Sequence, residues 1–243
     1  MRTVFLTETG NSNHLQYLLR GLSTVFSTTN TTALDVSNGK YQKISLTIPD
    51  PYLEFILAEI RQKLAEILVV GYKYRFFEDS VRVSGLTAEQ KELFLTAIIA
   101  ADLADDRKYA ENRIQMEKEI SVDGVYHFRM QRLCRKWEEI VDCLPSYFTA
   151  DLYHNFMQYL IDDFEGEQIY IVKDKVFDSR YNRSFLSALS GNIDALRIQK
   201  EILLSCGKEV HLVGPPDPAA VEFLKEFYGA NVFFHEGAGE LLC

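Results

Sequence analysis

The chain has 243 residues, of which 47% are hydrophobic and 25% are charged, and its formal net charge is −9. This composition excludes extended disorder, and the length is sufficient for one or two domains whose cores need no disulfide or metal. Six acidic residues but only one lysine fall between residues 209 and 243, so this segment is a poor candidate for contact with nucleic acid or an anionic membrane.

The first 50 residues predict a β-α-β-β unit. The alternation of Val4 and Leu6 with their neighbours indicates a strand over residues 2–7. Apolar residues at helical spacing then predict a helix over residues 15–26. Residues 31–48 predict a β-hairpin, because the Asn38-Gly39 pair suits a tight turn and the residues after it alternate between apolar and polar.

Residues 51–164 predict a block of helices. Asp50 is expected to cap a long helix that begins at Pro51 and runs to about Arg75. Thr87 is expected to open a second helix. A wide apolar stripe on the first of these helices indicates that it packs into a core rather than standing alone.

The second half of this block is expected to remain helical. The helix that begins at Thr87 bends near residues 102–107 and continues to Glu119 in this interpretation. Either Ser121 or Asp123 then caps a third helix, which ends before Pro145. A shorter fourth helix follows.

Residues 165–243 predict a strand–helix–strand module. It contains, in order, a strand at 169–172, a helix at 194–206, a strand at 210–213, a helix capped by Asp217 and a last strand at 232–234. Strands joined through a helix at this loop length are expected to pair in parallel. The sequence therefore predicts a mixed α/β (α+β) fold, with blocks at 1–50, 51–164 and 165–243, or all three blocks in one domain.

Targeting and cysteine patterns point to a cytoplasmic protein. No apolar run reaches the roughly 18 residues that a membrane-spanning helix needs, and the first apolar run breaks too early for a secretory signal. The chain has no C-x-x-C pair and no metal-ligand spacing of His and Cys; its cysteines are Cys134, Cys143, Cys206 and Cys243. We therefore expect free thiols and no cofactor.

The middle of the chain carries a segment that resembles a known family. Residues 120–130, Ile-Ser-Val-Asp-Gly-Val-Tyr-His-Phe-Arg-Met, are similar to the glycine-aliphatic-x-x-Phe-Arg-Leu segment of YtxC-like sporulation proteins. Residues 111–114 resemble the helix before that segment, and residues 153–160 resemble the family's Tyr-x-x-Phe-x-x-x-Leu helix. Met130 stands where the family usually has leucine.

The resemblance covers residues 110–243 and implies a biological setting. It suggests a cytoplasmic, sporulation-associated protein of spore-forming Firmicutes, and the family implies no defined biochemical activity. Some members end in a glycine-containing segment with cysteines. The corresponding segment here, Gly237–Cys243, contains a single cysteine. The resemblance therefore gives no support to a metal or redox role for this tail.

The best candidate for binding a partner is the basic side of the third helix. Phe128 and Arg129 belong to the segment that resembles the family, and Arg132 and Lys136 extend a basic face at helical spacing. These residues predict a site for a protein partner, and the alternative is a set of inter-helix salt bridges. The leading function is thus a non-enzymatic protein interaction. Nucleic-acid binding through residues 129–136 is an alternative that the net charge makes unfavourable, and the oligomeric state stays open between a monomer and a homo-oligomer.

A metal-dependent hydrolase is the other alternative. Asp102, Asp105 and Asp106 lie at i, i+3 and i+4, so one helix would bring their carboxylates together. A second acidic set follows at Asp162, Asp163 and Glu165, and two such sets facing each other would supply the oxygen ligands that Mg²⁺ prefers. The competing interpretation is a solvated helix end. We assign no catalytic residue from the sequence.

Overall fold

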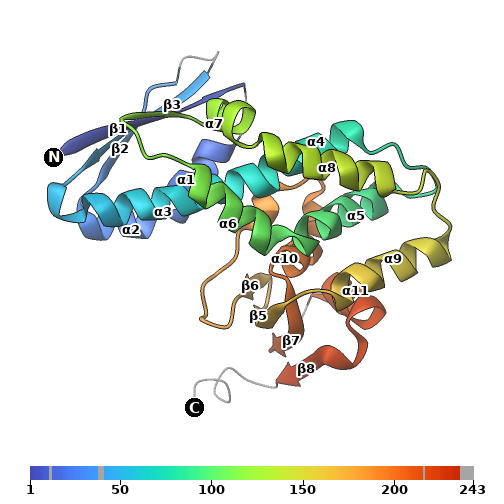
Figure 1. Ribbon diagram of the computed structural model, residues 1–243. Coiled ribbons are helices and arrows are strands. Elements are labelled where there is room, and N and C mark those ends of the chain that lie inside the picture. Colours follow the sequence, from blue (N-terminus) through green and yellow to red (C-terminus); the bar gives the residue numbers. More distant parts are fainter. Residues whose placement is uncertain (11–12, 38–40, 216, 236–243) are drawn as a thin grey trace. The chain divides into compact units, whose positions relative to one another are not determined.

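The computed structural model describes residues 1–10, 13–37, 41–215 and 217–235 (Figure 1). The predicted Asn38-Gly39 turn and the segment Gly237–Cys243 lie outside the described residues. The fold is mixed α/β with two four-stranded sheets, which confirms the predicted fold class. The chain divides into two compact units: unit 1 comprises residues 1–77 and 104–143, and unit 2 comprises residues 78–103 and 144–243.

The sheet of unit 1 has the strand order β2-β3-β1-β4. Its strands are β1 (Arg2–Thr9), β2 (Thr32–Asp35), β3 (Tyr41–Ile48) and β4 (Glu119–Ser121). The predicted hairpin is confirmed, because Thr32 faces Thr47 and Asp35 faces Ile44 in an antiparallel pair. Strand β4, in contrast, was not predicted: it falls at the junction between two predicted helices, and it pairs in parallel with β1.

The helices of unit 1 start and stop at more places than the sequence predicts. They are α1 (His14–Gly21), α2 (Ser23–Thr29), α3 (Leu53–Glu66), α4 (Lys73–Ser80), α6 (Leu103–Arg113), α7 (Val122–Arg129) and α8 (Gln131–Cys143). The helix predicted over 15–26 breaks at Leu22, and the helix predicted after Ser121 breaks at Met130. Ser121 does cap α7, because its hydroxyl accepts from the Gly124 N–H at 3.0 Å.

The long helix after Pro51 differs from the prediction at its start and in its middle. It begins as a short 3₁₀ turn, η1 (Asp50–Tyr52), whose N-cap residue is Pro49 rather than the predicted Asp50. The Asp50 carboxylate instead accepts from the N-terminal ammonium at 2.6 Å. Between α3 and α4 the helix widens into a π-helical segment, η2 (Ile67–Tyr72), whose side chains are all buried.

Unit 2 is built on the sheet β6-β5-β7-β8. Its strands are β5 (Gly166–Val172), β6 (Lys175–Phe177), β7 (Gly207–Val213) and β8 (Val232–His235). Strands β5, β7 and β8 are parallel, as predicted, whereas β6 forms an unpredicted antiparallel hairpin with β5. The buried side of the sheet carries alternate apolar residues such as Ile169, Ile171, Val210 and Leu212.

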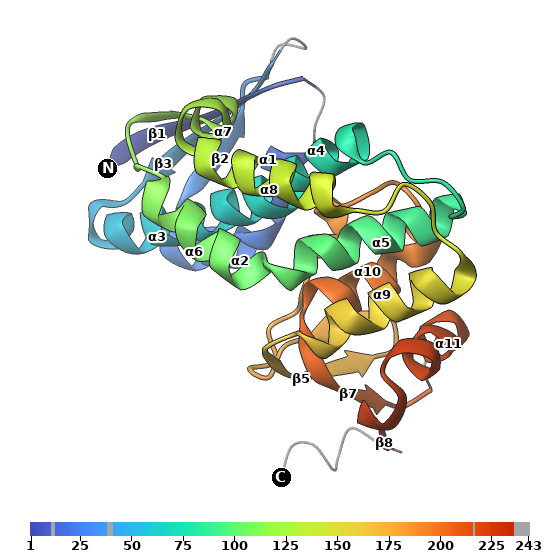
Figure 2. The same cartoon turned by 45° about the vertical axis from the view of Figure 1, so that its right-hand side comes forward.

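Helices α5 (Ala88–Ala101), α9 (Ala150–Asp162), α10 (Arg197–Leu204) and α11 (Pro218–Phe227) complete unit 2. Helix α10 packs against α5, and α9 packs against both α5 and α11 (Figure 2). Two predicted caps are confirmed: Thr87 forms a capping box with Gln90, and the Asp217 carboxylate accepts from the Ala219 N–H at 2.8 Å. None of the described helices combines the length and apolar character that crossing a bilayer requires.

Candidate interaction groove and buried polar cluster

A groove of about 630 Å³ lies between α6 and α8 in unit 1. Its lining mixes charged residues of both signs with Tyr109 and Leu133. The charged and polar members are Asp105, Asp106, Lys108, Asn112, Arg132, Arg135, Lys136 and Glu139. Arg132 and Lys136, both predicted as partner-binding residues, therefore line one depression together with Arg135, which the nucleic-acid alternative included, and Lys108, which was not predicted.

Asp106 anchors the floor of the groove. Its Oδ2 atom lies 2.7 Å from Nζ of Lys73 and accepts from the Trp137 indole N–H at 3.0 Å, and its Oδ1 atom lies 2.9 Å from Nζ of Lys136. Lys73 is fully buried, and Asp106 is 1% exposed. Helices α4, α6 and α8 are thus joined at one carboxylate.

The surroundings of Asp106 keep it ionised. Burial alone raises the pKa of the Asp106 carboxyl, but the charge of Lys73 and the hydrogen bonds from Lys73, Lys136 and Trp137 outweigh burial and hold that pKa below its usual range. A carboxylate held in this way is a structural counter-ion, because both of its oxygens are occupied by protein donors.

The groove carries an excess of basic charge. Four basic and three acidic side chains line it, and the buried Lys73 neutralises one of the acidic ones, Asp106. Lys108, Arg132 and Arg135 are exposed, and within the described part of the chain no carboxylate pairs with them. The groove is therefore suited to an anionic ligand.

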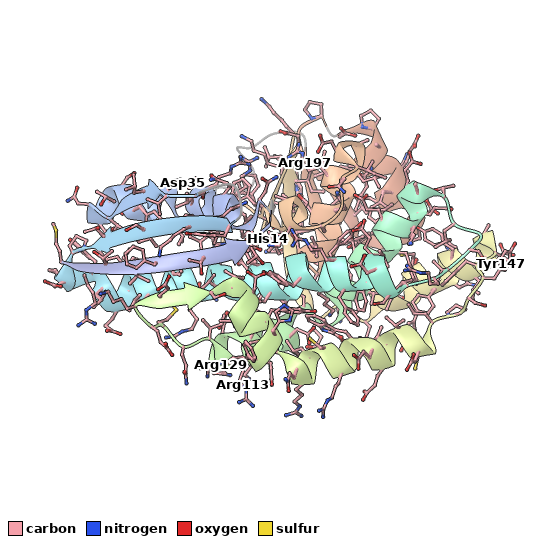
Figure 3. The ribbon with its side chains drawn as sticks, turned by 90° about the horizontal axis from the view of Figure 1, so that it is seen from above. His14, Asp35, Arg113, Arg129, Tyr147 and Arg197 are labelled. Carbon is pink, nitrogen blue, oxygen red and sulfur yellow. The ribbon has the colours of Figure 1, made fainter. Side chains whose placement is uncertain are left out.

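Phe128 and Arg129 lie apart from the groove lining. Both are exposed at the end of α7, where Phe128 retains 82% of its accessible surface. Arg129 extends outward from the ribbon (Figure 3). The four predicted partner-binding residues therefore form two groups, with Arg132 and Lys136 in the groove and Phe128 and Arg129 beyond it.

The three aspartates considered as metal ligands have separate roles. Asp102 terminates α5, and α6 begins only at Leu103, so the helical spacing that we predicted is interrupted. Asp105 is exposed in the groove, while Asp106 is bound by Lys73. In the described ranges, no three His, Cys, Asp or Glu side chains are placed to hold a metal ion.

A second polar cluster of unit 1 lies where β1 and β4 end. Because these strands are parallel neighbours, Glu8 of β1 and Asp123, just after β4, meet at the same edge of the sheet. The Tyr72 hydroxyl lies 3.1 Å from Oε1 of Glu8 and 2.9 Å from Oδ1 of Asp123. Oε1 of Glu8 is also 2.5 Å from Nδ1 of His14.

This cluster is enclosed rather than open to a ligand. Glu8, His14 and Tyr72 are 1%, 5% and 7% exposed. Gly71 is required for the fit, because a Cβ atom there would lie 2.6 Å from Nε2 of His14. Burial, followed by the charges of Glu8 and Asp123, raises the pKa of Tyr72, so the phenol keeps its proton and acts as a donor.

We expect the Tyr72 hydroxyl to stabilise the junction between these strand ends. Tyr72→Phe removes the donor shared by two carboxylates, one of them buried, and should lower the free energy of unfolding by about 1–3 kcal/mol. Urea denaturation of wild type and variant measures the difference. Tyr159→Phe is the matched control, because Tyr159 is 68% exposed and should change stability little. Equal effects of the two changes would show that the Tyr72 contacts contribute nothing.

Comparison of the chain with protein-family models, with curated proteins and with solved structures finds no match.

Proposed function

We propose that the protein is a non-enzymatic interaction protein whose groove between α6 and α8 binds an acidic segment of a partner protein. The observation that carries this proposal is the buried Lys73–Asp106 pair, which leaves the exposed basic residues of the groove in excess. Tyr109 and Leu133 add apolar contact area beside the charges. Such a mixture of basic and apolar groups suits a peptide that alternates acidic and apolar residues.

The acidic residues in the groove favour a peptide over a nucleic acid. Asp105 and Glu139 share the lining with Arg132 and Arg135, so a ligand with a charge at every phosphate would meet repulsion as well as attraction. A peptide can place its carboxylates opposite the basic residues and uncharged residues opposite the acidic ones. The net charge of −9 also repels a nucleic acid, with a charge at every nucleotide, more strongly than a peptide with a charge at every second residue.

The biological setting that we propose is the cytoplasm of a sporulating bacterium. It rests on the resemblance of residues 110–243 to YtxC-like proteins. If the setting is right, a fluorescent fusion to the chain in a spore-forming host should accumulate during sporulation and remain inside the cell. Constant expression through vegetative growth would contradict it.

The groove can be tested with a defined probe. A fluorescein-labelled 16-residue peptide of alternating glutamate and leucine should bind wild type in an anisotropy titration, and added salt should weaken the binding. Arg132→Glu with Arg135→Glu should raise Kd at least tenfold, since about 1.4 kcal/mol corresponds to a factor of ten. Lys118→Glu with Lys225→Glu changes the net charge equally at exposed positions outside the groove and should leave Kd within about twofold.

Two results would overturn the proposal. One is the absence of peptide binding to wild type at about 100 μM, which corresponds to less than about 5.5 kcal/mol of affinity. The other is tighter binding to a 20-nucleotide DNA, with the same loss in the Arg132 and Arg135 double variant, which would favour the nucleic-acid alternative.

A further inference from the structure

Strand β8 is an edge of the unit 2 sheet and exposes two consecutive phenylalanines. Phe233 is 42% exposed and Phe234 is 63% exposed. Consecutive strand residues point to opposite faces of a sheet, so both faces of this edge carry an exposed phenylalanine in the described part of the chain. Figure 1 shows β8 at the border of unit 2, next to β7. An edge of this kind presents unpaired backbone groups together with apolar side chains, and other strands can pair with it.

The other edge strands carry charged residues and β8 does not. Among the described strands, the edges of the two sheets are β2, β4, β6 and β8. Strand β2 contains Asp35, β4 contains Glu119 and β6 contains Lys175, whereas β8 is Val-Phe-Phe-His. Charged side chains on an edge oppose pairing with another sheet. Strand β8 is therefore the edge on which this protection is missing.

A row of stacked rings leads across the sheet to β8. Tyr170, His211 and Phe233 are in register on β5, β7 and β8, and their neighbouring ring centroids are 5.0 Å apart. Tyr181 stacks on Tyr170 at 5.1 Å. The spacing matches the distance of about 4.8 Å between neighbouring strands. A ring on a strand paired to β8 would continue the row on the open side of Phe233.

We propose that β8 pairs antiparallel with β8 of a second copy of the chain about a two-fold axis. Phe233 then faces Phe233 of the second copy, and Val232 faces Phe234. Aromatic–aromatic and aromatic–β-branched pairs are those that stabilise antiparallel strands. The row of rings then runs from one copy into the other.

The absence of charge on β8 favours a second copy over an unrelated strand. In a two-fold interface each residue meets the same surface patch of its partner, so a charged edge would meet its own charge. Strand β6, for example, would bring Lys175 close to Lys175. Strand β8 has no such conflict, and its own residues supply the complementary pairs.

The expected dimer is weak and strengthens with salt. A four-residue strand buries less than the area of about 1,200 Å² that is usual for stable complexes, so we expect a Kd in the micromolar range. Each copy carries a net charge of −9, so the copies repel each other and salt screens that repulsion. This salt dependence is opposite to the one expected for peptide binding in the groove. The two proposals can therefore fail separately.

Sedimentation velocity of the full chain from about 2 to 200 μM tests the pairing, because that range brackets a micromolar Kd. Wild type should shift from monomer to dimer, and more so at 0.5 M than at 0.05 M NaCl. Phe234→Lys should raise the dimer Kd at least tenfold. Leu34→Lys is the matched control, because Leu34 is 62% exposed on the edge strand β2. The dimer Kd of this variant should equal that of wild type.

A second measurement keeps the test independent of folding defects. Phe233→Cys, in a background where the four native cysteines are serine, should form a disulfide-linked dimer on mild oxidation, whereas Leu34→Cys in the same background should not. A wild-type chain that is monomeric throughout the concentration range overturns the proposal. A dimer that Phe234→Lys and Leu34→Lys weaken equally, or that Phe234→Lys does not weaken, overturns it as well.

Discussion

Replacing Asp106 with alanine should lower the free energy of unfolding by about 3–5 kcal/mol, which is the usual cost of removing one partner of a buried ion pair. The pair joins the Asp106 carboxylate to the ammonium of Lys73, which is fully buried and 2.7 Å away. The same change also removes the acceptor for the Trp137 indole N–H. Urea denaturation followed by Trp137 fluorescence measures the loss.

The neighbouring Asp105 provides the control for this prediction. Asp105 is exposed on the same helix, and Asp105→Ala should change stability by no more than about 0.5 kcal/mol. Lys73→Met combined with Asp106→Leu should recover most of the loss, since replacing both partners of a buried pair with apolar residues is often neutral. If Asp106→Ala costs no more than Asp105→Ala, the carboxylate does not hold the three helices together.

The Asp106 carboxylate should also make the free energy of unfolding depend on pH in the acid range. The pKa of Asp106 in the folded chain is below the ordinary value of 3.8, so the unfolded chain takes up this proton first as the pH falls. The stabilisation is complete above the unfolded pKa and is lost as the pH falls through the folded pKa. The stability difference between wild type and Asp106→Asn should therefore shrink as the pH is lowered below about 4.

Local signals in the sequence were sufficient for most of the fold. Thr87 and Asp217 begin helices because their side chains satisfy N–H groups within three residues, and such signals are contained in a short stretch of sequence. Strand β4 gave no such signal. It has three residues and one buried side chain, Ile120, and it is a strand only because β1 lies beside it, more than 110 residues earlier.

The candidate sites also show that local sequence signals do not reveal contacts between residues far apart in the chain. The spacing of Arg132 and Lys136 on one helix face is a local property, and both residues do line the groove. The partners of Asp106 could not be derived in this way, because Lys73 lies 33 residues away at the start of another helix, α4. Tertiary packing brings these residues together, and helical periodicity carries no information about it.

Unit 2 contains a second buried ion pair, and Lys200→Met should lower the free energy of unfolding by about 3 kcal/mol, near the lower end for such pairs. Nζ of Lys200 lies 2.6 Å from Oε1 of Glu92 and donates to the Ser190 carbonyl at 2.8 Å. The variant leaves the Glu92 carboxylate buried with only backbone donors, the N–H groups of Asn192 at 3.3 Å and Ile193 at 3.1 Å. Because these two hydrogen bonds remain, we expect a loss of about 3 kcal/mol rather than a larger one.

The loss of Lys200 should also loosen the loop at residues 191–193, which the Glu92 carboxylate holds in place. Gly191 has φ +63°, and a Cβ atom there would lie 2.2 Å from the Glu92 carboxyl group, so the loop is wrapped closely around that carboxylate. In Lys200→Met, hydrogen exchange at the amides of Asn192 and Ile193 should therefore accelerate together with the loss of stability. Arg197→Met is the control on the same helix: its ion pair with Asp174 is about half exposed, and such pairs contribute about 0–1 kcal/mol. If Arg197→Met were as costly as Lys200→Met, burial would not be what makes the Glu92–Lys200 pair matter, and the same reasoning about Lys73 and Asp106 in unit 1 would be weakened.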